Sequence, residues 1–172
     1  MAIYALRDSV PDIAPSVFVH PDATVIGNVT IGEGSTVWPQ AVLRGDYGKI
    51  VIGARTNIQD GAVIHCTREI DTLIGDDCVV GHLAHLECCV VEDGALVGTG
   101  AIVLHRAVVR SGALVGAAGL VPNGMDVPAG AIAVGVPARI REGAADSADI
   151  ARNAAEYARN GERFLEELRR LD

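Results

Sequence analysis

Residues 95–121 read ALVGTGAIVLHRAVVRSGALVGAAGLV. Within this stretch a valine returns at every sixth position, at Val97, Val103, Val109, Val115 and Val121. A period of six cannot keep these residues on one side of an α-helix, which turns once in about 3.6 residues. It suits short strands, whose side chains alternate between two faces, separated by regular turns. The stretch therefore predicts a coil of short β-strands.

The same period runs through most of the chain. The other large aliphatic residues of the series are Val19, Val25, Ile31, Val37, Leu43, Ile52, Ile58, Ile64, Ile74, Val80, Leu86, Val91 and Val127. Four residues after most of them stands a small residue, as at Ala101, Ala107 and Ala113. A large inward residue followed by a turn and a small inward residue suits a triangular coil. We therefore expect an all-β chain, a parallel β-helix of hexapeptide repeats with about six coils.

The two ends of the chain carry different signals. Residues 1–139 are predicted to form the β-helix domain, including an N-terminal lead-in interrupted by prolines. Residues 140–172 are predicted to form a C-terminal helical segment that packs on the β-helix. Asp146 is a suitable N-cap for this helix, and an apolar stripe, interrupted at Gly161, continues to about Leu171.

Composition excludes several classes of function. The net charge is −8 and Lys49 is the single lysine, which argues against binding of nucleic acid or of an anionic membrane. No apolar stretch is long enough to span a bilayer, and the N-terminus does not resemble a signal peptide. Four cysteines, two of them adjacent, do not form a pattern typical of secreted disulfide frameworks. We expect a cytoplasmic protein.

The repeat also decides which polar residues stack on one another. With three hexads in each coil, every third hexad returns to the same face, about 4.8 Å from the previous one. Face A then contains Leu43, Ile64, Leu86 and Val103, and face C contains Ile58, Val80 and Val97. On face A, the outward residues after the buried ones are Arg44, His65 and Glu87, and on face C Asp60 stacks on His82.

These stacks predict a metal site between subunits. Faces A and C are different sides of a triangle, so one chain cannot bring His82 to His65 and Glu87. Two chains can do so if face A of one packs beside face C of the next, and a cyclic homotrimer repeats this contact three times. Two histidines and a carboxylate are a usual ligand set for catalytic zinc, and Gln59 and Asp60 lie near enough to orient a ligand or water.

The joint spacing of several motifs resembles the gamma-class carbonic anhydrases over nearly the whole chain. The matching elements are Arg44-Gly-Asp46, Asn57-Ile-Gln-Asp60, Gly61 with His65, Ile74-Gly-Asp-Asp77, Val80-Gly-His82, Leu96-Val-Gly98, Val115-Gly116, Pro122 and Gly135-Val-Pro137. The resemblance implies a left-handed β-helix, a homotrimer and one metal at each subunit interface. It implies reversible hydration of carbon dioxide to bicarbonate by a metal-bound hydroxide, the reaction of a carbonate dehydratase, which is a lyase.

The resemblance also assigns roles to individual residues. The family's first two histidine ligands correspond to His65 and His82. Its active-site glutamine, aspartate and helical tyrosine correspond to Gln59, Asp60 and Tyr157, and its subunit-linking pair to Arg44 and Asp46. Zinc is the expected metal, although iron and cobalt accept the same ligands, and no organic cofactor is expected.

The third ligand departs from the family pattern. The family has a histidine five residues after the second one, where this chain has Glu87, and His85 is the alternative ligand. A carboxylate neutralises more metal charge than imidazole does, so it predicts a weaker or absent activity. Active family members use glutamates near the site for proton transfer; here Tyr47 follows the Arg-Gly-Asp motif, and Glu69 or Asp71 are the available carboxylates.

Other functions stay open. Many hexapeptide β-helices transfer acyl groups from coenzyme A, so an acyltransferase, or a thioesterase that acts on acyl-coenzyme A, is one alternative. A non-catalytic scaffold that binds a metal or a siderophore is another. Cys66, Cys88 and His105 also stack on face A and could hold a metal themselves or, through the two cysteines, form a disulfide, while Cys89 has no assigned role.

Overall fold

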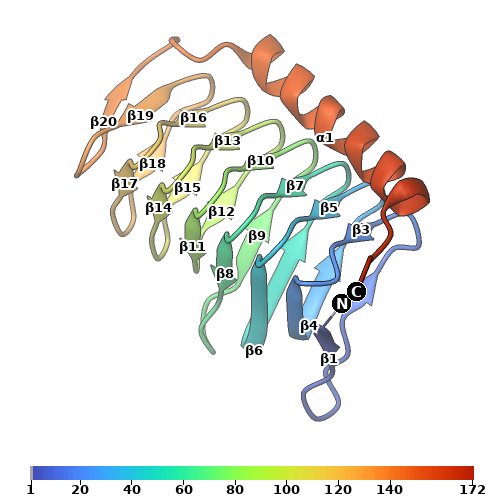
Figure 1. Cartoon of the computed structure of the whole chain (residues 1–172). Coiled ribbons are helices and arrows are strands. Elements are labelled where there is room, and N and C mark those ends of the chain that lie inside the picture. The colour runs from blue at the N-terminus through green and yellow to red at the C-terminus, as the bar shows by residue number, and fades with distance from the viewer. Residues whose placement is uncertain (1) are drawn as a thin grey trace.

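A computed structural model describes residues 2–172 and confirms a parallel β-helix followed by one C-terminal helix (Figure 1). Face C is a ladder of seven parallel strands: β3 (Phe18–Val19), β5 (Thr36–Val37), β7 (Asn57–Ile58), β10 (Val79–Val80), β13 (Leu96–Val97), β16 (Leu114–Val115) and β19 (Ile132–Val134). A final strand, β20 (Arg139–Arg141), pairs antiparallel to β19. This turn back ends the parallel ladder.

The other two faces share one sheet. Face A contains β8 (Val63–His65), β11 (His85–Glu87), β14 (Ile102–Val103) and β17 (Leu120–Val121). The third side, face B, contains β2 (Asp12–Ile13), β9 (Thr72–Ile74), β12 (Val90–Val91), β15 (Val108–Val109) and β18 (Asp126–Val127). The long strands β4 (Thr24–Ile31) and β6 (Val42–Ile52) join them, because the start of β6 pairs with β8 and its end with β9.

The predicted register is confirmed on faces A and C. On face A, Ile64 pairs with Leu43 on one side and Leu86 on the other, and Leu86 pairs in turn with Val103. All four side chains are completely buried. Burying one aliphatic side chain contributes about 1.5–3 kcal/mol to the free energy of folding. The stacked aliphatic side chains inside the coils are therefore the main source of stability.

The coils number about seven rather than the predicted six. The difference lies at both ends of the predicted series: β1 (Ala2–Tyr4) and β2 pair with β4 before Val19, and β19 pairs with β16 after Val127. Pro11 lies between β1 and β2, and Pro15 follows β2, so the missing N–H of each proline removes no ladder hydrogen bond.

The C-terminal helix α1 (Ser147–Glu167) lies along face C and runs back toward the N-terminal coils (Figure 1). Asp146 caps it as predicted, since its carboxylate accepts a hydrogen bond from the Asp149 N–H at 3.0 Å. The helix continues through Gly161, where the apolar stripe is interrupted, and ends at Glu167 rather than at about Leu171. Gly161 is buried against Thr36, where a larger residue would hold the helix away from face C.

Aromatic side chains pack the C-terminal half of α1 against the first coils. The ring of Trp38 lies 5.6 Å from Tyr157 and 5.0 Å from Phe164, and Phe18 lies 5.6 Å from Phe164. Such edge-to-face contacts add to the apolar burial. They also hold Tyr157 on face C. Among residues 2–172, no helix combines the length and the apolar character needed to cross a membrane.

Candidate metal centre

His65, at the end of β8 on face A, lies between two carboxylates. Its Nε2 is 3.0 Å from Asp46 Oδ1, and its Nδ1 is 2.9 Å from Glu87 Oε1. The second contact follows from the register, because His65 and Glu87 are direct partners in the ladder. A histidine tied to a carboxylate through one nitrogen has a defined ring orientation, as metal-binding histidines usually do.

Glu87 is the hub of a larger cluster. Its Oε2 lies 3.4 Å from His105 Nε2 and 3.6 Å from His85 Nε2, while Oε1 faces His65. Three imidazoles therefore surround one carboxylate within a single chain. The sequence analysis grouped His105 with cysteines and not with Glu87. The signal for the contact with Glu87 is that His105 stands two residues after Val103, in the coil next to Glu87.

The charges around His65 stabilise both carboxylates in the ionised form. Burial by itself would raise the pKa of Glu87, but hydrogen bonds from His65 and His105 outweigh it and lower that pKa. Burial would likewise raise the pKa of Asp46, but hydrogen bonds from His65 and Arg44 lower it. Both groups are therefore anionic at neutral pH, as metal ligands or their partners must be.

Arg44 pairs with Asp46 within the same strand. In this chain the pair thus supports His65, since Asp46 contacts both residues. Its predicted role in linking subunits stays a prediction.

The other predicted site residues gather on face C. His82 Nδ1 lies 2.9 Å from Asp60 Oδ2, and nearly half of each side chain is exposed. Gln59 is buried and donates a hydrogen bond to Asn57 Oδ1 at 2.9 Å. Burial, together with the negative charge of Asp60, raises the pKa of Tyr157, so the phenol stays protonated at neutral pH. One chain therefore carries the predicted site residues as two groups on different faces.

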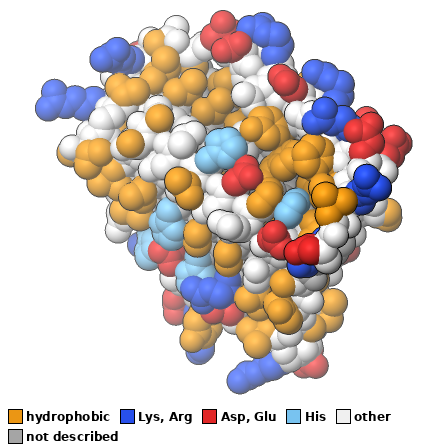
Figure 2. Space-filling model, in the orientation of Figure 1, with side chains coloured by type: hydrophobic (Ala, Val, Ile, Leu, Met, Phe, Trp, Pro, Cys, Tyr) orange, Lys and Arg blue, Asp and Glu red, His pale blue; other side chains and the backbone are white. Residues whose placement is uncertain are grey.

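The donor groups on both faces, imidazole and carboxylate, are of the types that zinc accepts. Asp46 occupies Nε2 of His65 and leaves Nδ1 directed at Glu87, while Asp60 occupies Nδ1 of His82 and leaves Nε2 available. In Figure 2, histidine and acidic side chains lie beside each other on the face in view. A carboxylate behind each imidazole is the arrangement that fixes the tautomer for metal binding.

A second group of ligand type lies within one chain. Ligand atoms of Glu87, Cys88 and His105 all lie within 4.8 Å of one another. The sequence suggested Cys66 with Cys88 and His105; the structure has Glu87 in place of Cys66. All four cysteines are free and buried, so no disulfide forms between Cys66 and Cys88.

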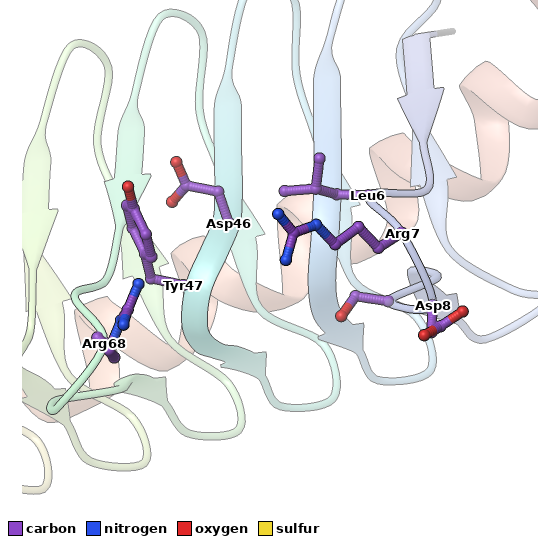
Figure 3. Close-up of a pocket in the computed structure, with 7 residues that line it drawn as sticks. Leu6, Arg7, Asp8, Asp46, Tyr47 and Arg68 are labelled. Carbon is purple, nitrogen blue, oxygen red and sulfur yellow. The ribbon is translucent and has the colours of Figure 1, made fainter.

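A pocket of about 750 Å³ adjoins Asp46 (Figure 3). Its lining includes Tyr47, Arg7 and Arg68, and the guanidinium of Arg68 lies 5.4 Å from the centre of the Tyr47 ring. Asp71, considered above for proton transfer, accepts a hydrogen bond from the Lys49 N–H at 2.7 Å. That bond ties it to the β6 backbone.

Comparison with known proteins agrees with this architecture. The family model described as bacterial transferase hexapeptide (six repeats) matches residues 11–45. The chain is 37% identical to the carnitine operon protein CaiE of Salmonella agona over 140 residues, which are 81% of this chain and 71% of that protein. A crystal structure of a hexapeptide transferase family protein from Anaplasma phagocytophilum is 32% identical and has a TM-score of 0.91. It covers 95% of this chain and 98% of its own.

The chain belongs to the hexapeptide-repeat transferase family. Its other relatives include CaiE of Escherichia coli K12, 41% identical over 108 residues, which are 63% of this chain. That match spans 55% of the length of the E. coli protein. A Bacillus cereus structure described as a proposed acetyltransferase is 34% identical with a TM-score of 0.92, covering 95% of this chain and 96% of its own. Within the hexapeptide-repeat transferase family, the reaction must be inferred from the site.

Proposed function

We propose that the protein is a metal-dependent hydratase that interconverts carbon dioxide and bicarbonate at the interfaces of a homotrimer. The observation that carries this proposal is the position of His65, which Asp46 orients through one nitrogen while Glu87 lies 2.9 Å from the other. The second half-site, His82 with Asp60, lies on a different face. A neighbouring subunit is therefore needed to complete the ligand set.

His65 and Glu87 of one subunit and His82 of the next would hold the metal, with zinc as the expected ion. When bound, a divalent metal supplies Lewis acidity that activates water for attack on carbon dioxide. Because Glu87 is anionic, it reduces the effective charge of the metal more than a histidine would. We therefore expect hydration activity to be weak.

The remaining residues of face C would position His82 and form hydrogen bonds with water and product. Asp60 holds the imidazole of His82, so it is a positioning residue. The amide nitrogen of Gln59 is committed to Asn57, which leaves its carbonyl oxygen to accept a hydrogen bond from water. Tyr157 stays protonated next to Asp60 and can donate a hydrogen bond to an anionic product such as bicarbonate.

Subunit complementation tests this proposal. We expect a trimeric mass by sedimentation and the loss of hydration activity in both His65→Ala and His82→Ala. Any mixed trimer of these two variants has one interface at which an intact His65 meets an intact His82. Co-expression should then restore up to about one third of the activity of the wild-type trimer, since cyclic symmetry provides three equivalent interfaces. Retained activity in either single variant, or a mixed trimer without activity, would contradict a shared site.

The third ligand needs a separate comparison. Glu87 and His85 project from the same side of β11, and both contact the cluster. We expect Glu87→Ala to lower metal content per subunit and His85→Ala to leave the interface metal in place. The reverse result would make His85 the ligand.

Acyl transfer is the second candidate, because the matched family model and similar structures are described as transferases. Acetyl transfer from acetyl-coenzyme A that persists after chelation of all metal would favour this function over hydration. Calorimetry with coenzyme A provides a direct check, since a metal-only hydratase has no reason to bind it.

A further inference from the structure

Glu87, Cys88 and His105 form a ligand group that needs no second subunit. Their ligand atoms lie within 4.8 Å of one another. Leu86 and Val103 are partners in the face A ladder, so the residues that follow them in adjacent coils must stack. The cluster is therefore a consequence of the register.

The thiol of Cys88 is held in a position suited to metal binding. Cys88 has a φ of 56° and is buried, and its own N–H donates to Thr72 Oγ1 at 2.8 Å. The N–H of Thr67 donates to the sulfur at 3.2 Å. A backbone N–H directed at the sulfur fixes the position of this ligand atom next to Glu87.

The two oxygens of Glu87 face different partners. Oε1 lies 2.9 Å from His65 Nδ1, toward the interface half-site, and Oε2 lies 3.4 Å from His105 Nε2. One carboxylate can thus ligate a metal at each of two positions, one through each oxygen. Occupation of the second position does not require the first to be filled.

The distances suit a tetrahedral ion. Ligand atoms bound to tetrahedral zinc lie about 3.5 Å apart, given bonds of about 2.0–2.3 Å. The contact between His105 and Glu87 already has this length, and about a third of the His105 side chain is exposed, so it has freedom to turn. Its exposed side leaves room for water as a fourth ligand.

We propose that Glu87, Cys88 and His105 form a second metal position within each subunit, next to the interface site and sharing Glu87 with it. Thiolate, imidazole and carboxylate together select a borderline divalent ion, zinc or cobalt, over magnesium or calcium. The fully loaded protein would then hold two metals per subunit.

Cobalt titration of the metal-free protein tests this position, because cobalt bound to thiolate has a charge-transfer absorption in the near ultraviolet. We expect the band in the wild-type protein and its loss in Cys88→Ser. His105→Ala should weaken cobalt binding, followed by this band, at least ~10-fold, because it removes one of three protein ligands. Circular dichroism and thermal unfolding of each variant check that the fold is kept. About a third of the His105 side chain is exposed, so its variant tests the site even if Cys88→Ser is destabilised.

Matched controls sit in the same cluster. Cys66 is also buried and lies beside Cys88 in the adjacent coil, and His85 has a similar exposure to His105 and also contacts Glu87 Oε2. Cys66→Ser and His85→Ala should keep the band. Loss of the band in Cys66→Ser would overturn this ligand set in favour of two cysteines.

His82→Ala separates this position from the interface site. We expect this variant to lose hydration activity and keep the cobalt–thiolate band. A wild-type protein without the band at saturating cobalt would overturn the second position and leave the hydratase proposal intact. A wild-type protein with the band but without hydration activity would leave the second position standing alone.

Discussion

At the scale of single residues, the close spacing of coils decides which glycines are required. Gly98 has no unusual φ, yet an added Cβ would lie 2.7 Å from both Ala117 N and Val115 O in the next coil. Gly100, two residues later, has a φ of 65° and open space around it. The first glycine is needed for room and the second for its backbone conformation.

Alanine substitutions separate these two requirements. We expect Gly98→Ala to destabilise by about 3 kcal/mol, because a coil must shift to relieve the collision. Gly100→Ala should cost only about 1 kcal/mol, the strain of alanine in a left-handed conformation. Urea unfolding of both variants measures the two free energies, and equal losses would contradict the assignment.

At the scale of elements, α1 depends on Gly161 for its close approach to face C. A glycine inside a helix is normally worse than alanine by about 0.5–1 kcal/mol. Here the sign should reverse, because an alanine Cβ at this position would collide with Thr36 Cγ2 on β5. The loss should also disturb the aromatic cluster that holds Tyr157.

We therefore expect Gly161→Ala to lower the unfolding free energy and to speed hydrogen exchange in α1. The exposed residue Arg159 provides the control, since Arg159→Ala should change stability by less than about 0.5 kcal/mol. A stabilised Gly161→Ala protein would show that α1 can lift from face C without cost.

At the scale of the whole molecule, ion pairs between coils give the fold a dependence on pH. Arg110, which follows β15, reaches Glu92 at 2.8 Å and Asp126 at 2.7 Å, so it joins three successive coils on face B. Its hydrogen bonds lower the pKa of both carboxyls. Carboxyl groups whose pKa is lower in the folded than in the unfolded protein stabilise the fold at a pH above their unfolded pKa of about 4. This stability is lost as the pH falls through their folded pKa.

Removing Arg110 should flatten this acid dependence. We expect the urea midpoint of the wild-type protein to fall between about pH 5 and pH 3, and to fall less in Arg110→Gln. The exposed helical pair of Arg152 and Asp149 provides the control, because Arg152→Gln breaks an ion pair that joins no coils. An unchanged pH dependence in Arg110→Gln would mean that this ladder does not contribute to acid stability.

The sequence by itself determined the repeat, the register and the stacking of Glu87 on His65. This was possible because a hexad period is a local property: covalent spacing alone decides which residues return to the same face. The same reasoning placed His82 over Asp60 on a separate face. The predicted ligands can therefore be assigned to faces from the sequence.

Only the tertiary structure decided the details that depend on side-chain direction and on contacts between distant segments. The orientation of His105 and Cys88 toward Glu87 depends on rotamers and turn conformations that a period does not specify. The close packing of Gly161 on Thr36 depends on how a helix docks far along the chain from β5. Spacing along the chain identifies the face of a residue, whereas packing in three dimensions selects its partners.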